Sequence, residues 1–425
     1  MSHLTPKQHR ELVTKFNKLL NENIVNVAEI KHLIWKEGLP NDNEIRPLVW
    51  KLLLGYYTPN RNEWQKIDDY QSHKYPQYVA RYMPERENII LNNSKIIKRA
   101  KNEDDEMDAY PIKNSSITMN EKEERMISLI EKDIARTVIG VAYNSDYIIR
   151  HDFGYRRILY LIHKVLPTVE YVQGMNDICN VFYVMLASSS DDPNYLDIEA
   201  QTFGMMLRLF TYMCDWFDMK KDETPTGIVP AMEDIERMIK ENDKQIYNKL
   251  VSNGIDSRFY IFSWLTLFFC HDFPRVHILT YWDYFFLDLN TFIIVKATCC
   301  GVVISLKNQL LNLDMPSMLG LLQNIPYTDP MEHIKIAKKV LGDRFDIRKL
   351  HIQQSNLNVK QSVSKPQPME RSKSTGMKTS SQSLPMQQTT HKIPGFFTPS
   401  KPFKIGTSSD SQSNTPQSSS FCENK

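Results

Sequence analysis

Two short stretches of the chain contain residues whose types and spacing could do chemistry. In the first, Asp133 and Arg136 are three residues apart, which makes them neighbours on the surface of a helix. A carboxylate at this distance can hold a guanidinium in one orientation, and the guanidinium stays charged at neutral pH. Taken alone, such a pair is most often an ordinary surface ion pair worth about 0–1 kcal/mol.

The second stretch is Tyr171-Val-Gln173-Gly174, which follows Pro167 and precedes a helix predicted to begin at Met175. An amide followed by glycine, in a loop before a helix, could be presented to a partner, because glycine lets another backbone come close. Taken alone, a loop glutamine is usually just solvated. Neither stretch therefore indicates a function by itself.

A helix over residues 119–139 must position the first stretch. Asn120 can cap this helix, with Glu123 three residues on as in a capping box. At 100° per residue, Asp133 and Arg136 fall together on the polar side. The opposite side carries an apolar stripe that we expect to face the core, made of Ile127, Ile130, Ile134 and Val138.

The rest of the chain up to about residue 345 also has helical periodicity, with no hairpin signal and no internal repeat. The predicted fold is all-α, with one large domain. Helices are expected at Thr5–Leu20, Val27–Trp35 and from Pro47, and over residues 86–100, 119–139, 152–166, 175–188, 195–214, 229–252, 258–272, 276–288, 291–313 and 328–342.

Composition separates the C-terminal residues from this body. Residues 346–425 are rich in Ser, Gln and Pro and should be disordered, because they cannot bury enough apolar surface to offset their ordering entropy. The last 75 residues carry nine basic and three acidic side chains, whereas the first 350 are slightly acidic. We divide the chain into an N-terminal helical extension (1–27), a helical domain (28–345) and a disordered tail (346–425).

Several classes of function are excluded. The 14 glycines form neither a G-x-G-x-x-G nor a P-loop pattern, so the chain is not expected to bind a nucleotide by itself. A slightly acidic body does not suit nucleic acid. His271 and His277 are six residues apart, not the four that would place both on one helix face, and no Cys/His cluster has metal spacing.

The order of the motifs is more informative than any one of them. Ile130-x-x-Asp133-x-x-Arg136, followed by Tyr171-x-Gln173-Gly174, resembles the two signature motifs of the TBC-domain family, GTPase-activating proteins for Rab GTPases. The resemblance covers roughly residues 30 to 345, and Phe262-Ser-Trp264 resembles the member-thirteen subgroup. The family's flanking landmarks, each interpreted alone as packing, are matched by Gly38, Pro40, Arg46, Trp50, Trp264, Phe273-Pro274 and Trp282-Asp283.

This resemblance implies a TBC-domain helical fold of two lobes and a function. Arg136 would be an arginine finger and Gln173 a glutamine finger, both supplied in trans to a GTP-bound Rab-family GTPase. Asp133 would orient the Arg136 surface, Tyr171 would pack beneath the loop, and Gly174 would permit close approach at the GTPase switch. The chain would need no cofactor of its own, since GTP and Mg²⁺ belong to the partner, and it would act as an activator in vesicle trafficking.

Two questions stay open at this point. A non-catalytic helical module that binds a Rab or acts as a scaffold is the alternative function, although the presence of both finger residues favours catalysis. The location is expected to be the cytosol, because the six cysteines show no pairing pattern and the N-terminus has no apolar signal segment. Recruitment to endomembranes would come through the partner, and the dispersed charges of the tail would attract anionic lipid only weakly.

Overall fold

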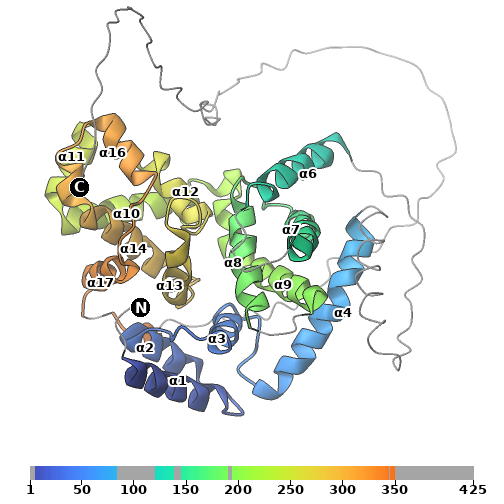
Figure 1. Cartoon of the computed structure of the whole chain (residues 1–425). Helices are drawn as coiled ribbons and strands as arrows, with labels where there is room; N and C mark the ends of the chain where they lie inside the picture. The colour runs from blue at the N-terminus through green and yellow to red at the C-terminus, as the bar shows by residue number, and fades with distance from the viewer. Residues whose placement is uncertain (1–4, 84–119, 138–144, 190–193, 344, 350–425) are drawn as a thin grey trace, which may run out of the picture. The chain divides into compact units, whose positions relative to one another are not determined.

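A computed structural model of the chain describes residues 5–83, 120–137, 145–189, 194–343 and 345–349. In these residues the chain is all-α, apart from one isolated bridge between Ile24 and Asn60. The α-helices (Figure 1) are α1 Pro6–Leu20, α2 Val27–Glu37, α3 Ile45–Leu53, α4 Trp64–Tyr82, α6 Glu121–Ile134, α7 Ser145–Val165, α8 Met175–Ala187, α9 Tyr195–Met213, α10 Ile228–Asn242, α11 Lys244–Ser252, α12 Ile261–Thr266, α13 Arg275–Phe285, α14 Ile293–Ser305, α15 Lys307–Leu310, α16 Met315–Leu322 and α17 Pro330–Leu341.

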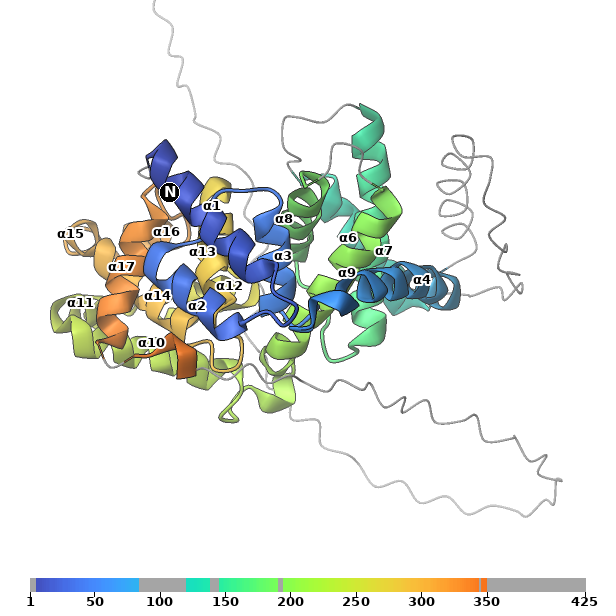
Figure 2. The same ribbon diagram turned by 90° about the horizontal axis from the view of Figure 1, so that it is seen from below.

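These helices pack as two lobes, as the predicted fold class requires. Helices α4 and α6–α9 contact one another in the first lobe. In the second, α10, α12, α13, α15 and α17 pack around α14, and α11 contacts α10 and α15. Helices α1, α2 and α3 contact one another, and α2 also contacts α13 of the second lobe. A second view shows α8 between α6 and α7 on one side and α12 and α13 on the other (Figure 2). The start of α8 therefore belongs to the region where the lobes meet, and Gln173 lies in the loop just before it.

Several predicted helices are interrupted. The stretch 229–252 is two helices, because Asp243 leaves the helical backbone and its carboxylate caps α11 by accepting from the amides of Gln245 and Ile246. The stretch 258–272 keeps helix only over Ile261–Thr266, and the stretch 291–313 breaks at Leu306. The predicted helix over 86–100 lies outside the described residues. In each break a capping side chain or a buried turn replaces regular helix.

Two helices were not predicted from the sequence. Helix α4 contains Pro76 and buries only Trp64, Tyr75 and Val79, which leaves no continuous apolar stripe to detect. Helix α16 is short; the Asp314 side chain caps it, and a proline lies in its first turn. Helix α4 was missed because packing of α7 and α9, and not its own periodicity, stabilises it. Helix α16 was missed because eight residues are too few to show a helical period.

A buried ion pair and an aromatic cluster join segments from the two ends of the domain. Arg46 donates from Nε and Nη2 to the two carboxylate oxygens of Asp283, at 3.1 and 3.2 Å, and the indole of Trp50 donates to the same carboxylate at 2.8 Å. The Trp50 ring also lies 5.6 Å from Trp282 of α13 and 6.1 Å from Phe182 of α8. The landmark residues thus pack as predicted, and their charges also pair in the core.

A second buried ion pair holds the first lobe together. Arg157 of α7 donates to both carboxylate oxygens of Glu199 in α9, at 3.0 and 2.5 Å, and Tyr75 of α4 donates to Glu199 at 3.1 Å. A Cβ on Gly154 would lie 2.9 Å from this carboxylate, so the glycine makes room for the pair. A bidentate pair of this kind fixes geometry as well as charge. It sets the position of α7, on which α6 packs.

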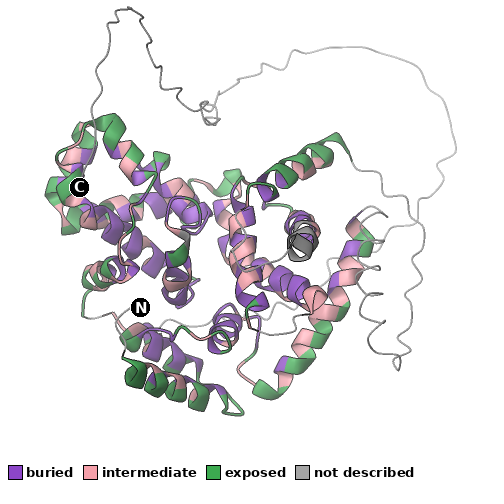
Figure 3. Cartoon of the chain, viewed as in Figure 1, coloured by how far each residue is buried: buried purple, intermediate pink, exposed green. Residues whose placement is uncertain are grey.

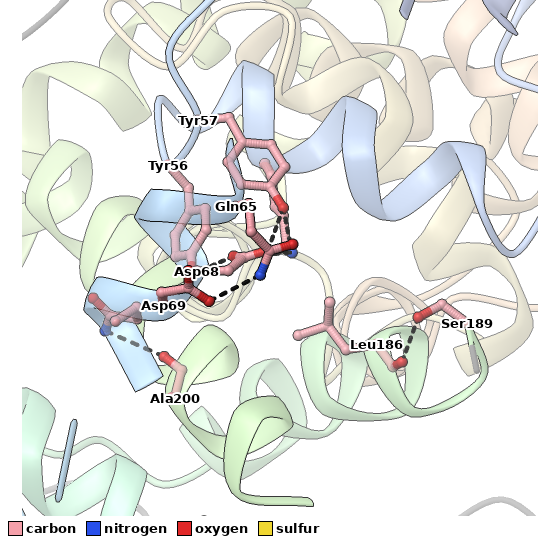
Figure 4. A network of polar contacts seen from close by, with 10 residues as sticks. Tyr56, Tyr57, Gln65, Asp68, Asp69, Leu186, Ser189 and Ala200 are labelled. Atoms are coloured by element: carbon pink, nitrogen blue, oxygen red, sulfur yellow. Dashed lines mark hydrogen bonds and ion pairs between the residues drawn. The ribbon is translucent and has the colours of Figure 1, made fainter. Parts of the chain in front are cut away.

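Asp68 of α4 organises the junction with α3 (Figure 4). The hydroxyls of Tyr56 and Tyr57 donate to its two carboxylate oxygens at 3.0 and 2.6 Å. The buried ammonium of Lys51 lies 3.5 Å from the carboxylate and donates to the Tyr57 hydroxyl at 3.0 Å. Burial lowers the pKa of Lys51, and Asp68 opposes that effect. The network therefore satisfies a lysine that would otherwise be costly to bury.

Burial differs along the chain (Figure 3). Helices α8, α13 and α14 are largely buried, whereas α1 and α6 carry many exposed residues. None of the described helices is both long and apolar enough to cross a membrane. The described helices belong to one compact unit, residues 1–360. The disordered tail was predicted to begin at residue 346, but Ile347–Lys349 forms a short 3-10 helix that packs on α2 and buries Ile347, so the start of the predicted tail is wrong. Residues from 350 onward lie outside the described part. The exact boundary at 27 stays a prediction.

Helices α14 and α17 approach closely at Gly301, and this contact can be tested. A Cβ on Gly301 would lie 2.7 Å from the carbonyl oxygen of His333, a backbone atom that cannot move away cheaply. We expect Gly301→Ala to lower the free energy of unfolding by about 1–3 kcal/mol, as overpacking does. Gly320→Ala in α16 is the control, because nothing lies within 4 Å of its Cβ. Urea unfolding should show that control to be neutral or slightly stabilising, and equal effects of the two changes would contradict the prediction.

His333 should make the fold sensitive to acid. Its Nδ1 lies 2.6 Å from the Tyr281 hydroxyl, and burial, followed by the neighbouring His277, lowers the pKa of His333 from 6.5 to about 4 while Asp329 opposes the shift. Below pH 6.5 the unfolded chain takes up a proton that the folded chain excludes, so His333 should cost about 3 kcal/mol of unfolding free energy between pH 6.5 and 4. The measurement is urea unfolding of wild type and His333→Gln across this range. As pH falls, the free energy of unfolding of wild type should decrease more than that of the variant. Parallel profiles would contradict it.

Candidate functional site

The site begins where α6 ends. Asn120 caps α6 by accepting from the amide of Glu123, whose side chain accepts in return from the Asn120 amide, so the predicted capping box is confirmed. The helix ends at Ile134, earlier than predicted, and Arg136 lies in the turn that follows, where its amide donates to the Asp133 carbonyl at 3.0 Å. The predicted apolar residue Val138 lies outside the described part of the chain. Arg136 is therefore presented by a turn, not by a helix face.

The guanidinium of Arg136 is exposed and yet held. Its side chain is 59% exposed, while that of Asp133, its partner, is only 3% exposed. Nη2 donates to the Asp133 carboxylate at 2.5 Å and Nε donates to the Lys132 carbonyl at 3.1 Å. The prediction that Asp133 lies on the polar side is wrong: the carboxylate is buried, because it is also bonded to a second segment of the chain.

That second segment is the Tyr171 loop. The Tyr171 hydroxyl donates to the other carboxylate oxygen of Asp133 at 2.8 Å. The side-chain amide of Asn176 donates from Nδ2 to the Thr137 hydroxyl at 2.8 Å and, more weakly, to the Asp133 backbone carbonyl at 3.4 Å. Burial and Asp133 together raise the pKa of Tyr171 well above its usual range, so its hydroxyl keeps the proton that it donates. The Arg136 turn and the loop are thus one hydrogen-bonded unit.

Gln173 and Gly174 occupy the tip of this loop. Gln173 is exposed, and Gly174 is buried at the position that begins α8, with φ of +103°. A Cβ on Gly174 would also lie 2.7 Å from the Leu267 side chain. Only glycine suits this backbone and this gap, so within the chain Gly174 permits a close internal contact with the segment after α12. The position of Gln173 follows from the turn that Gly174 allows.

Sequence reasoning missed Asn176 and did not assign a structural part to Thr137. Asn176 is buried in the first turn of α8 and bonds to the Arg136 turn, as described above. The available signal was an amide three residues after Gln173, in the first turn of a helix that is largely apolar after Asp177. A buried amide needs partners, which could have indicated a bond to a neighbouring segment but not to which one.

Ion pairs with α7 fix the rest of α6. Glu123 pairs with Lys164, and Glu131 accepts from Arg156 at 2.6 Å, so the contacts lie near both ends of α6. The buried pair of Arg157 with Glu199 itself holds α7 in place. The Arg136 turn is therefore connected, through α6 and α7, to the core of the first lobe. Such support limits the movement of the side chain that α6 presents.

Comparison with known proteins agrees with this arrangement. Residues 43–311 match the family model for the Rab-GTPase-TBC domain. The chain belongs to this family. The match is shorter than the predicted domain of residues 28–345, and it includes Arg136, Gln173 and most of the landmark residues.

Two relatives of known name align with less than half of the chain. TBC1 domain family member 13 from Mus musculus is 33% identical over 184 residues, which are 43% of this chain and 46% of the relative. The chain thus spans about half the length of this relative. The GTPase-activating protein GYP1 from Saccharomyces cerevisiae is 22% identical over 172 residues, 36% of this chain and 26% of GYP1. The crystal structure of the Ypt/Rab-GAP domain of Gyp1p matches with a TM-score of 0.61 and 20% identity, over 78% of this chain and 97% of that one, and so shares the fold.

The bond between Tyr171 and Asp133 can be tested by its contribution to stability. Tyr171→Phe leaves one oxygen of a buried carboxylate without its donor, and we expect the free energy of unfolding to fall by about 1–2 kcal/mol. The control is Tyr70→Phe, at an exposed tyrosine of α4, which should change stability by less than about 0.5 kcal/mol. Urea unfolding measures both. If Tyr171→Phe behaves like its control, this bond does not hold the loop.

Proposed function

We propose that this chain is a GTPase-activating protein that accelerates GTP hydrolysis by a Rab-family small GTPase, with Arg136 and Gln173 inserted into the partner's nucleotide site. Membership of the Rab-GTPase-TBC domain family supports the class of partner. The observation that carries the proposal is the exposed guanidinium of Arg136 held by the buried carboxylate of Asp133. The structure presents a fixed positive charge outward, as an arginine finger requires.

Arg136 would stabilise the charge that develops on the transferred phosphoryl group. Small GTPases hydrolyse GTP slowly because this charge is poorly compensated, and an arginine from a partner accelerates the step by about 10³–10⁵-fold. A guanidinium has five N–H donors, so its bonds to Asp133 and Lys132 leave donors for phosphoryl oxygens. Because the group is already oriented, little reorganisation is needed during the reaction.

Gln173 would orient the attacking water in the same site, in place of the GTPase's own glutamine, as the family resemblance implies. Its amide can donate to one group and accept from another, which suits a water that must lose a proton. Tyr171 and Asn176 connect its loop to the Arg136 turn, so that the two fingers keep a defined separation. The pair would therefore enter the partner as one unit.

GTP and Mg²⁺ would be carried by the GTPase in its GTP-bound form, and the chain would need no cofactor of its own. It would act as an activator and turn over no substrate by itself. Through this partner it would regulate vesicle trafficking and be recruited from the cytosol to endomembranes.

The experiment is single-turnover phosphate release from a panel of GTP-loaded Rab GTPases. Arg136→Ala should reduce the acceleration of the responsive GTPase by at least about 10³-fold, and Gln173→Ala should reduce it by at least about tenfold, since it removes the group that places the water. Arg136→Lys should behave nearly like Arg136→Ala, because an ammonium lacks the planar fork of donors. The matched control is Arg125→Ala, at an exposed arginine of α6, the helix before the Arg136 turn, that pairs with Glu121.

Three results would contradict the proposal. A loss of activity in Arg125→Ala as large as that in Arg136→Ala would show that the effect is not specific to the Arg136 guanidinium. A lysine that keeps more than about a tenth of wild-type activity would show that charge alone suffices. Binding to a GTP-loaded Rab without acceleration, and without preference for GDP plus aluminium fluoride over a GTP analogue, would favour the non-catalytic binding module, because a catalyst binds the transition-state mimic more tightly.

A further inference from the structure

A second exposed cationic group lies close to the start of α8. The side chain of His271 is 57% exposed, and its Nδ1 lies 2.9 Å from the Asp272 carboxylate, whose side chain is only 5% exposed. The Ser263 hydroxyl donates to the other oxygen of Asp272. The Asp272 carbonyl accepts from the Ile325 amide at 2.9 Å. Asp272 is therefore itself held by two other segments, through its carboxylate by Ser263 and through its backbone by Ile325.

This arrangement has the same form as that at Arg136. In both, a cation that is more than half exposed is held by a carboxylate that is almost fully buried. An ordinary surface pair such as Arg258 with Asp256 differs, because its carboxylate is 30% exposed and the pair can rearrange in water. Burying a carboxylate is costly unless it is bonded, so both sites use buried groups to orient an outward charge.

The His271 segment adjoins the Gln173 loop. Leu267 lies against Gly174, as described above, and the Cys270 amide donates to the Leu267 carbonyl at 2.9 Å. His271 also feels the charge of Asp177, in the first turn of α8. In both views α8 lies between α6 and α12 (Figures 1 and 2). Arg136 follows α6 and His271 follows α12, so the two residues come after helices on opposite sides of α8. Gln173 precedes α8 itself.

The turn before His271 has a constrained backbone. Phe268 and Phe269 have φ of +50° and +71°, a conformation that is unfavourable for residues with bulky side chains. Burial of both rings and a 2.9 Å bond from the Trp282 indole to the Phe268 carbonyl hold this turn in place. The side chain that follows the turn therefore has a defined direction.

The surrounding charges favour the protonated imidazole. The bond to Asp272 raises the pKa of His271 above 6.5, burial opposes this, and the charges of Asp272 and Asp177 add to the increase. Ser263 contributes a hydroxyl but no charge. His271 should therefore carry more positive charge near neutral pH than an isolated histidine does.

We propose that His271 is a docking contact of the same GTPase-binding surface, which pairs its imidazolium with an acidic side chain of the partner beside the Gln173 loop. This inference rests on the proposed function. An imidazole has a shorter reach than an arginine, so His271 would meet the partner's surface, whereas Arg136 reaches the nucleotide. The contact would strengthen docking without entering the chemical step.

The test measures KM and kcat for the GTPase that responds best in the panel, from pH 6 to pH 8, with the full chain. At pH 6.5, His271→Gln should raise KM about two- to fivefold with kcat unchanged, the size expected of an exposed ion pair. As pH rises above 6.5, the advantage of wild type should shrink. His271→Arg should keep the low KM and lose this pH dependence. His9→Gln on α1 is the matched control, and thermal unfolding checks that every variant is folded.

The outcomes separate this inference from the proposed function. Wild-type KM in His271→Gln, with Arg136→Ala still inactive, would overturn the docking contact and leave the GTPase activation standing. A fall in kcat at constant KM would also overturn it, because the imidazole would then act on the nucleotide. A constant advantage of wild type at every pH would exclude a contact through the imidazolium. If wild type accelerates no Rab, both proposals fail.

Discussion

The buried carboxylate of Asp133 is the interaction on which the candidate site depends. One of its oxygens accepts from Arg136 and the other from Tyr171, so a single charge joins the end of α6 to the loop before α8. Were the carboxylate exposed, water would compete for both bonds and the pair would be worth little. Because it is buried, releasing either partner leaves an uncompensated charge, which is far more costly. The orientation of the exposed arginine therefore derives its stability from a residue that no partner can touch.

The same device recurs where distant segments must be joined. Asp283 bonds to Arg46 and Trp50 across more than two hundred residues, and Glu199 bonds to Arg157 from a neighbouring helix. In an all-α protein most backbone bonds lie within each helix, so side chains make most of the connections between one helix and another. Apolar packing supplies most of that contact but is not directional. Buried, hydrogen-bonded charges are directional, so they fix how one helix is oriented against the next. The exposed site residues depend on that orientation.

Much of the helical pattern could be predicted from local signals. The capping box of α6 depends only on residues 120 to 123, and the apolar periodicity of α8 and α9 is visible over each whole helix. That of α7 was detected only from residue 152, although the helix begins at Ser145. The break at Asp243 was missed because apolar residues continue at helical spacing on both sides of it, at Ile239 and Ile246. The end of helix after Thr266 was missed because the segment that follows remains apolar in sequence. At Asp243 the cap of α11 decides where the helix breaks, and after Thr266 buried aromatic contacts decide where it ends. Helix α4 shows the converse, since its three buried residues become an interior face only when α7 and α9 pack on it.

The sequence by itself determined the helical class and the order of the motifs, because helix periodicity, caps and short motifs involve residues close together in the chain. It also identified Arg136 and Gln173 as the side chains to examine. Only the tertiary structure decided that Asp133 is buried, that Asn176 connects the two motifs, and that Gly174 makes room for Leu267. A helical wheel places Asp133 relative to its own helix alone. Its burial depends on a tyrosine 38 residues away, and such a contact exists only when two segments fold against each other.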